Sequence, residues 1–412
     1  MPRSVLLPIR LLRQLFDEAV RVADPMAVIP QVLPPRPDGR VVVIGAGKAS
    51  ARMAEAVEHA WGPCEGLVIT RYGYARPCAG VEIVEAAHPV PDAAGERATA
   101  RMLALLEGLG EDDFVLALIS GGASSLLVAP GPGLTLGDKQ AAGAALLASG
   151  EAIGAMNTVR KHLSRVKGGQ LAAMAYPARM LALMISDVPG DDPAAIGSGP
   201  TVGEAQGPEA ARAILHRIGA LTPRLEAALA QSGVLPPGAA RLSRVDNRVV
   251  IAPSRSLQAA ADLARGQGIQ VDLLGDSVEG EARAVARAHA ALALSRQDGQ
   301  RRLLLSGGEL TVTRKGDGIG GPNAEYALAL ALALKGAPGI HAIACDTDGV
   351  DGAAEVAGAV IGPHTLDTPG AAEALAANDA HSFFARAQGQ VVTGPTLTNV
   401  NDFRAILIDP VP

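Results

Sequence analysis

The sequence predicts an α/β protein whose first half forms a doubly wound, mostly parallel sheet. Short apolar runs alternate with amphipathic helical segments, and this alternation is typical of that fold class. The runs are unbroken by polar residues, as in strands buried on both faces. Several of them stop abruptly in polar, glycine-rich turns, which in such sheets lie where ligands bind. With 412 residues, of which 48% are hydrophobic, we expect two domains.

The elements of the first half follow from local patterns. Leu12, Leu15, Phe16, Ala19 and Val20 recur at i, i+3, i+4, i+7 and i+8, which predicts an amphipathic opening helix. Strands are predicted at residues 41–44, 67–70, 81–84, 114–119 and 180–185, with helices reaching about residue 60, ending near residue 107 and opening at a capping box of Thr135 and Asp138.

The alternation weakens over residues 203–244 and then restarts. We therefore place a boundary near Pro236-Pro237-Gly238, giving domains at 1–238 and 239–412. In the second domain we predict strands at 249–251, 271–274, 303–305, 342–344 and 405–408, helices reaching 264 and spanning 281–294 and 325–334, and a hairpin arm at 310–313.

Bulk composition excludes several classes of function. A net charge of −6 and 2% aromatic residues argue against a nucleic-acid partner. The 3 cysteines have no metal-site spacing and suit reduced thiols in a cytoplasmic protein. No apolar run approaches the roughly 18 residues that span a bilayer, and the start of the chain has no signal-peptide layout. We therefore expect a cytoplasmic protein with no membrane partner.

The stretch after the predicted strand 180–185 carries three aspartates. Asp187 and Asp191 would bind a hard cation or accept a proton, and Ser198 and Gly199 would add backbone N–H groups. An ordinary polar turn is the alternative.

The turn Gly45-Ala46-Gly47-Lys48 follows the first predicted strand. Its glycines would let a phosphate approach the backbone at a helix N-terminus. Ser50 replaces the third glycine of a dinucleotide fingerprint, and Val42 replaces the first glycine of a P-loop. Neither motif is supported, so Lys48 is either a ligand for phosphate or carboxylate or a solvated lysine beside a packing turn.

Three further polar tracts keep two readings each. Ser120-Gly121-Gly122-Ala123-Ser124-Ser125 is an anion nest or a tight strand-to-helix turn. The tract Asp346 to Gly352 departs from the EF-hand order, and either binds magnesium or hydroxyls or is a plain turn. Asn399, Asn401 and Asp402 offer amide and carboxylate groups for a ligand or form an Asx-turn.

Nine short segments, taken together and in chain order, identify a protein family more specifically than any one of them does. They are Gly45-Ala-Gly-Lys-Ala-Ser, Ala87-His-Pro-Val-Pro-Asp, Ser120-Gly-Gly-Ala-Ser-Ser, Met156-Asn-Thr-Val-Arg-Lys-His-Leu, Ser186-Asp-Val-Pro-Gly-Asp, Ile196-Gly-Ser-Gly-Pro-Thr, Ser306-Gly-Gly-Glu, Asp348-Gly-Val-Asp-Gly and Thr393-Gly-Pro-Thr-Leu-Thr-Asn-Val-Asn-Asp. Together they resemble the glycerate 2-kinase family, also called MOFRL-type glycerate kinase. Some members are labelled hydroxypyruvate reductase. The resemblance covers nearly the whole chain.

The resemblance implies two three-layer α/β/α domains with an active site in the cleft between them. It implies transfer of the γ-phosphoryl group of ATP to the 2-hydroxyl of D-glycerate, giving 2-phosphoglycerate, with Mg²⁺ as cofactor. The partners are then a nucleotide and D-glycerate, and a homodimer is left open.

Phosphoryl transfer needs positioning and charge neutralisation, which suggests roles for the motif residues. Lys48 and Mg²⁺ would act on the transferring phosphate, and Asp187 or Asp191 would hold the metal or orient the hydroxyl. Arg160 would bind the glycerate carboxylate bidentately. The remaining expected binding residues are Gly45, Gly47, Ser120, Gly121, Gly122, Ser124, Ser198, Gly199, Ser306, Gly307, Gly308, Glu309, Asn323, Asp346, Asp348, Asp351, Asn399 and Asn401.

One departure from the family pattern keeps alternatives open. A familiar form of a later loop is Gly-Gly-Arg-Asn-Gln-Glu, and here it is Gly320-Gly321-Pro322-Asn323-Ala324-Glu325. Either Arg314 or Lys315 replaces the missing arginine, or activity is altered. An NAD(P)H-dependent hydroxypyruvate reductase and a non-catalytic metabolite-binding relative are the alternative functions.

Overall fold

Six parallel strands, in the order β3-β2-β1-β4-β5-β6, form the sheet of the first unit. The computed structural model describes residues 3–352 and 354–411, and this first unit comprises Pro25–Asp187 and Asp191–Ile251. Its strands are β1 (Val41–Ala46), β2 (Glu65–Arg71), β3 (Val81–Ala86), β4 (Phe114–Ile119), β5 (Arg179–Ile185) and β6 (Val245–Ile251). All neighbours pair in parallel, so the predicted doubly wound parallel sheet is confirmed.

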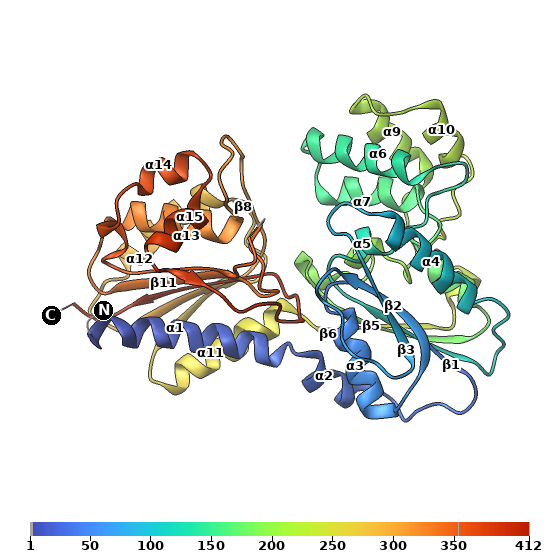
Figure 1. The fold of residues 1–412 in the computed structure, drawn as a ribbon, viewed down its shortest axis with the longest axis horizontal. Helices are drawn as coiled ribbons and strands as arrows, with labels where there is room; N and C mark the ends of the chain where they lie inside the picture. Colours follow the sequence, from blue (N-terminus) through green and yellow to red (C-terminus); the bar gives the residue numbers. More distant parts are fainter. Residues whose placement is uncertain (1–2, 353, 412) are drawn as a thin grey trace. The chain divides into compact units, whose positions relative to one another are not determined.

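Helices of the first unit flank this sheet and form a separate cluster beside it. They are α2 (Pro25–Val32), α3 (Ser50–Trp61), α4 (Ala93–Leu105), α5 (Ala123–Leu126), α6 (Leu136–Ser149), α7 (Ile153–His162), α8 (Gln170–Ala175), α9 (Pro208–Arg217) and α10 (Pro223–Leu229). The capping box of Thr135 and Asp138 opens α6 as predicted. Helices α6, α7, α9 and α10 gather together (Figure 1) around an apolar core that includes Leu146, Val159 and Leu215.

The second unit has a mixed sheet in the order β13-β12-β11-β14-β9-β7. It contains the described residues of Met1–Asp24, Val188–Gly190 and Ala252–Pro412. The strands are β7 (Gln270–Gly275), β9 (Arg302–Ser306), β11 (Ile340–Asp346), β12 (Gly358–Ile361), β13 (Gln390–Val391) and β14 (Asp402–Ile408). Strands β7 and β9 pair in parallel, and the other neighbours pair antiparallel.

Side chains of the second sheet alternate between two apolar cores, which gives this unit three layers. Leu303 and Leu305 pack with α1 (Arg3–Val22) and α11 (Pro253–Gly266). Leu304, between them in sequence, packs on the opposite face with α12 (Ala282–Ser295), α13 (Pro322–Leu334), α14 (Ala371–Ala376) and α15 (Ala380–Arg386). Figure 1 shows α1 and α11 side by side under this sheet.

Two predictions about the chain's organisation differ from the structure. The strand expected to open the second domain is β6, which instead completes the first sheet beside β5. The predicted opening helix forms as α1, but it belongs to the second unit, where the Phe16 and Phe403 ring centroids lie 5.8 Å apart. The compact units therefore divide the chain differently from the expected boundary at residues 238 and 239.

Shorter elements also depart from expectation. The segment predicted as a hairpin arm is β10 (Leu310–Thr311), which pairs in parallel with β8 (Gly280–Glu281). Strands β12 and β13 were not predicted. Among the described helices, none is long and apolar enough to cross a bilayer.

Candidate functional site

The predicted site residues of the first unit lie at the carboxyl ends of three adjacent strands. The turn after β1 carries Lys48, the turn after β4 runs from Ser120 to Ser125, and Asp187 follows β5. In the strand order of this sheet the direction of winding reverses between β1 and β4. Ligands of doubly wound sheets bind at such a reversal, so the structure brings these turns together at the expected place.

The glycines after β1 serve the packing of two turns against each other. A Cβ on Gly47 would lie 2.0 Å from Ser120 Oγ, and one on Gly45 would lie 2.5 Å from the Leu118 oxygen. The backbone amides of this turn are used inside the fold, because Lys48 N donates to the Gly121 oxygen at 2.8 Å and Ala49 N donates to Ser120 Oγ at 3.0 Å. This use differs from the phosphate cradle that the sequence suggested.

The turn after β4 keeps open donors. Within the part of the chain that the structure describes, the amides of Gly121 and Gly122 have no hydrogen-bond acceptor. Gly122 has φ 82, and a Cβ placed there would lie 3.1 Å from Cδ2 of His88 and 3.3 Å from Cγ of Lys48. The half-buried Lys48 and His88 side chains therefore border two successive N–H groups, an arrangement that suits an anion.

A chain of polar contacts connects this turn to α7. Ser124 Oγ shares a short hydrogen bond with Ser198 Oγ, and Ser198 Oγ donates to Asn157 Oδ1 at 3.2 Å. Arg160 Nη1 donates to the same Asn157 oxygen at 3.4 Å. Gly199 has φ 61, and its carbonyl accepts from Gly169 N at 2.9 Å. The structure thus brings Ser124, Ser198 and Arg160 together, whereas Gly199 supports the loop.

Asp187 and Asp191 flank the turn after β5, and both are half-buried. Asp191 has φ 54, a left-handed conformation that is uncommon outside glycine. Among the described residues no group of three or more His, Cys, Asp or Glu side chains is arranged to hold a metal ion.

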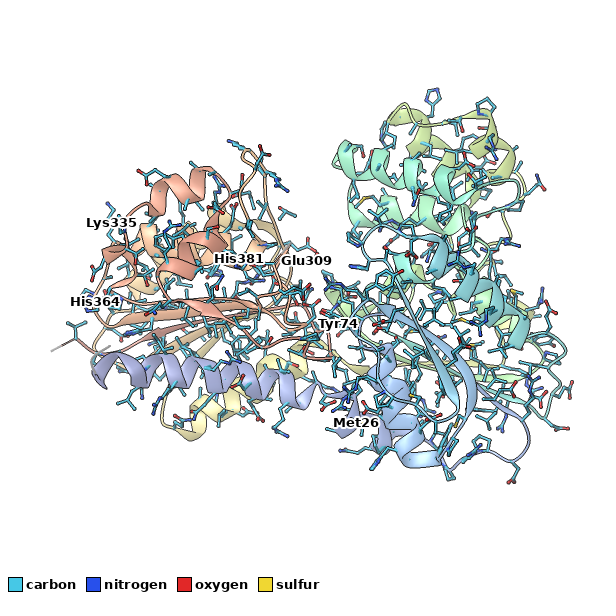
Figure 2. The ribbon with its side chains drawn as sticks, in the orientation of Figure 1. Met26, Tyr74, Glu309, Lys335, His364 and His381 are labelled. Carbon is cyan, nitrogen blue, oxygen red and sulfur yellow. The ribbon has the colours of Figure 1, made fainter. Side chains whose placement is uncertain are left out.

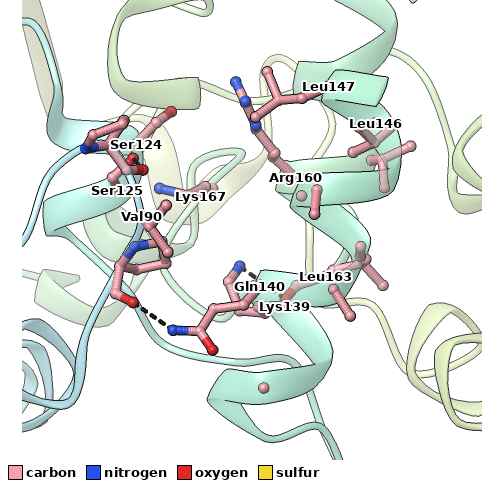
Figure 3. A pocket seen from close by; sticks show the side chains of 18 residues that line it. Val90, Ser124, Ser125, Lys139, Gln140, Leu146, Leu147, Arg160, Leu163 and Lys167 are labelled. Carbon is pink, nitrogen blue, oxygen red and sulfur yellow. Dashed lines mark hydrogen bonds between the residues drawn. The ribbon is translucent and has the colours of Figure 1, made fainter. Parts of the chain in front are cut away.

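A cavity of about 600 Å³ opens beside the turn after β4 in the first unit. Ser124 and Ser125 form part of its wall, and Leu146, Leu147 and Val90 line it with apolar surface. Figure 3 shows Lys139, Arg160 and Lys167 reaching it from three segments.

Among the described residues that line the cavity none is Asp or Glu, and its cations are held by neutral oxygens. Lys139 Nζ donates to the Leu163 oxygen at 3.2 Å and Lys167 Nζ to the Leu127 oxygen at 3.1 Å. In the described part of the chain, neither lysine nor Arg160 has a carboxylate partner. By contrast Lys161, one residue from Arg160, pairs with Glu204 at 2.5 Å.

Burial of these three cations disfavours their charged forms. Burial, followed by the neighbouring charge of Arg160, lowers the pKa of Lys139 to about 8. Burial, with Lys139 and Arg160 nearby, lowers the pKa of Lys167 well below its ordinary value, and burial also lowers the pKa of Arg160. An anion in the cavity would reverse these effects.

The predicted residues of the second unit gather at one edge of its sheet. Strand β9 ends at Ser306 and β11 ends at Asp346, while antiparallel β14 begins between them at Asp402. Gly307, Gly308 and the exposed Glu309 follow β9. Asp348 Oδ1 accepts from Val350 N at 2.8 Å, and Asn399 Oδ1 accepts from Asn401 N at 3.4 Å, so the Asx-turn interpretation of Asn399 and Asn401 holds locally.

Asp351 is tied into this edge by internal contacts. It is buried and accepts from Asn323 N at 2.9 Å, from Ala324 N at 2.8 Å and from His381 Nε2 at 2.9 Å. Figure 2 labels His381, which lies on α15 within this unit. Asp351 therefore caps the N-terminus of α13, where Pro322 occupies a first-turn position that suits proline.

Asp402 and Arg404 are buried residues of this edge, of which Asp402 was considered from the sequence as a ligand or part of an Asx-turn and Arg404 was not assigned. Arg404 Nη1 donates to Asp402 Oδ2 at 2.8 Å, and Arg404 Nη2 donates to the Gly307 and Gly308 oxygens. Burial raises the pKa of Asp402 to about 6 against the opposing effect of Arg404. The polar tract before β14 indicated this region, but the contact of Arg404 with the turn after β9 depends on strand pairing.

Residues 11–231 match a family described as a domain of unknown function, DUF4147, and residues 302–402 match the MOFRL family. A relative from Agrobacterium vitis, named as a hydroxypyruvate reductase, is 50% identical over 97% of this chain and 94% of its own. A D-glycerate 2-kinase from Thermotoga maritima is 36% identical over 94% of this chain and 95% of its own.

The fold also matches a solved structure. The crystal structure of a glycerate kinase from Thermotoga maritima superposes with a TM-score of 0.86 at 34% identity, covering 99% of this chain and 100% of that one.

Proposed function

Because this chain belongs to the glycerate 2-kinase family, we propose that it transfers the γ-phosphoryl group of ATP to the 2-hydroxyl of D-glycerate. The observation that supports this most is the turn after β4. Its open Gly121 and Gly122 amides lie beside Lys48, and two residues further on it borders a cationic cavity. The turn after β4 thus carries amide donors for a transferring phosphate and borders the cavity that Arg160, on α7, lines as a donor for a carboxylate.

Lys48 and the two amides act on the transferring phosphate. Phosphoryl transfer concentrates negative charge on the equatorial oxygens, so catalysis depends on donors that are already in place. The Gly122 backbone holds Lys48 against His88, because the absent Cβ leaves the space that both side chains border.

Arg160 binds the carboxylate of D-glycerate. Its guanidinium lines the cavity, and Asn157 holds one of its nitrogens, which leaves other donors for a bidentate carboxylate. Ser124 and Ser198 lie on the same polar chain and orient the hydroxyls of the acid.

Asp187 and Asp191 are the proposed ligands of Mg²⁺. Magnesium in kinases is usually held by one or two carboxylates together with substrate phosphates, and the hard oxygens of these two residues fit that role. When bound, the ion neutralises charge on the phosphates. Where one of the two carboxylates is enough to hold the ion, the other orients the 2-hydroxyl.

In the reaction the 2-oxygen of glycerate forms a bond to the γ-phosphorus, and the bond from that phosphorus to the β,γ-bridging oxygen breaks. ADP leaves with the electron pair, and the hydroxyl proton passes to a carboxylate or to water. For the second unit we keep the Ser306-Gly307-Gly308 turn as a proposed binding turn, in which Gly308 N has no acceptor among the described residues, whereas Gly307 N donates to the Gly275 oxygen at 2.9 Å.

A coupled assay of ADP release with D-glycerate, followed by NMR of the product, tests this function. We expect ADP release that requires glycerate, and phosphorus on the 2-oxygen. A 3-phosphorylated product would overturn the regiochemistry, and no glycerate-dependent release would overturn the kinase.

The name of the Agrobacterium vitis relative makes hydroxypyruvate reduction the competing activity. The amides of the Gly45-Ala46-Gly47-Lys48 turn that a dinucleotide would need are used within the fold. We therefore expect no loss of NADH or NADPH absorbance when the protein is mixed with hydroxypyruvate.

A further inference from the structure

The cavity beside α6 and α7 holds more positive charge than a monoanionic substrate requires. Arg160 alone accounts for the carboxylate of glycerate. Lys139, on α6, and Lys167, after α7, add two further cationic groups in the same cavity. Buried charges in proteins are ordinarily paired, because an unpaired buried charge loses its solvation by water without compensation.

The lysine next to Arg160 in the sequence has the carboxylate partner that these cations lack. Lys161 is buried, whereas Arg160 is half-buried, and Lys161 pairs with Glu204. Lys167 is 1% exposed and is held by one backbone carbonyl, although an ammonium has three donors. Leu146 gives the cavity a buried apolar wall, whereas Leu147 and Val90 line it from exposed positions.

The volume of the cavity and the chemistry of its lining residues limit the class of ligand that it can bind. A cavity of about 600 Å³ falls within the usual range for small-molecule sites. Its donors are one guanidinium, two ammonium groups and the Ser124 and Ser125 hydroxyls. These match a carboxylate and a phosphate carried on neighbouring carbons better than a single carboxylate.

We infer that this cavity is a receptor for a small polyanion, a phosphorylated hydroxy acid, in which Lys139 and Lys167 bind the phosphate while Arg160 binds the carboxylate. The inference rests on the proposed function for the identity of that acid, which is then the reaction product bound without nucleotide, with its phosphate on the two lysines and not at the transfer position beside Lys48. It follows that the protein binds phosphoglycerate more tightly than glycerate, and that Lys139 and Lys167 set this preference.

Titration calorimetry without nucleotide tests the inference on the whole chain. The probes are 2-phosphoglycerate, D-glycerate and inorganic phosphate. We expect 2-phosphoglycerate to bind at least 10-fold more tightly than glycerate, and inorganic phosphate to compete with it. Lys139→Met and Lys167→Met should each weaken 2-phosphoglycerate at least 10-fold while changing glycerate affinity less than 3-fold.

Two further variants separate binding from structure. Lys139→Arg keeps the charge and should retain the preference, whereas a purely structural lysine would not be rescued in this way. Lys335→Met removes one charge from the exposed end of α13 (Figure 2) and should leave all affinities unchanged. Should Lys167→Met fail to fold, Lys139→Met carries the test.

Equal affinity for glycerate and 2-phosphoglycerate, or Lys139→Met binding 2-phosphoglycerate like the unmodified protein, would overturn the inference. The kinase assay is independent of this outcome. A protein that releases no ADP but discriminates through Lys139 would keep the polyanion receptor and lose the proposed function. Normal kinase turnover without discrimination between 2-phosphoglycerate and glycerate would keep the proposed function and overturn the polyanion receptor.

Discussion

Lys48 occupies the point where the two best-supported features of the first unit meet. Its backbone joins the turns after β1 and β4, and its side chain borders Gly122. The motif on the sequence indicated a lysine facing an anion, and the open amides of Gly121 and Gly122 support that prediction. The sequence did not indicate that the neighbouring glycines serve packing, because Gly47 and Ser120 are far apart in the sequence and meet only through the pairing of β1 with β4.

Replacing Lys48 with alanine should lower turnover by about 100-fold or more, because one preorganised charge on a transferring phosphate contributes that order of catalysis. The melting temperature should stay within about 2 °C, since the backbone contacts of Lys48 remain. Steady-state ADP release and thermal unfolding measure the two effects. A variant with normal turnover would remove Lys48 from the mechanism.

Gly122→Ala tests whether the turn positions Lys48 and His88. The left-handed φ costs about 1–2 kcal/mol for a residue with a Cβ, and the new methyl would crowd both side chains. We expect turnover to fall about 10- to 100-fold. Gly108→Ala is the matched control, because Gly108 has φ 72 with open space around it, and it should lose similar stability but keep turnover. Equal turnover in both variants would contradict the positioning role.

The lowered pKa of Lys139 leads us to predict that polyanion binding depends on pH. This pKa of about 8 lies below its ordinary value of 10.5, so between these pH values the unfolded chain holds a proton that the folded protein lacks. Keeping Lys139 protonated in the folded protein therefore lowers the free energy of unfolding. This destabilisation is full below pH 8 and disappears as the pH rises toward 10.5. Binding needs the protonated lysine, so 2-phosphoglycerate affinity should fall from pH 7 to pH 9.

Calorimetry in two buffers of different ionisation enthalpy checks this, because binding near pH 8 should take up protons. Lys139→Arg should flatten the Lys139 part of the profile, since arginine stays charged. Binding that strengthens as pH rises would be the opposite of what we expect.

At the scale of elements, polar loop residues of the second unit make hydrogen bonds that stabilise the adjoining helices and strands. Asp351 was expected to bind a ligand, and its contacts with Asn323, Ala324 and His381 make it the cap of α13. Local strands and helices were predictable because burial imposes period-two and period-3.6 patterns. The pairing of Leu310–Thr311 with β8 was not, since two-residue strands carry no such pattern.

Asp351→Ala should lower the free energy of unfolding by about 2–4 kcal/mol, because it leaves two helix amides and a buried histidine without an acceptor. Asp367→Ala removes an exposed partner of His364 and should change the free energy of unfolding by less than about 0.5 kcal/mol. Urea titration measures both. Lost activity with unchanged stability would restore the ligand-binding role of Asp351.

At the scale of the whole molecule, sequence patterns gave the order of elements better than their assignment to units. The opening helix was predicted from its apolar face, but that face packs on Leu257 and Phe403, which lie far along the chain. Strand β6 was expected to open a second domain because the alternation of strands and helices restarts there after residues 203–244, yet it pairs in parallel with β5. Long-range pairing of this kind leaves no local signature in a single sequence.

The same limit applies to the site. Arg160 was expected to bind a carboxylate and indeed lines the cavity, whereas Lys139 and Lys167 were not assigned. Their significance comes from the absence of acidic residues among the cavity's lining side chains, which only the folded arrangement of α6, α7 and the turn after β4 reveals.

The most direct measurement of the central claim is ADP release by the whole protein with D-glycerate and ATP, with the product identified by phosphorus and carbon NMR. We predict release that depends on glycerate, a product phosphorylated on the 2-oxygen, and loss of both in Lys48→Ala. ADP formation that ignores glycerate, or none at all while NADH is consumed with hydroxypyruvate, would contradict it.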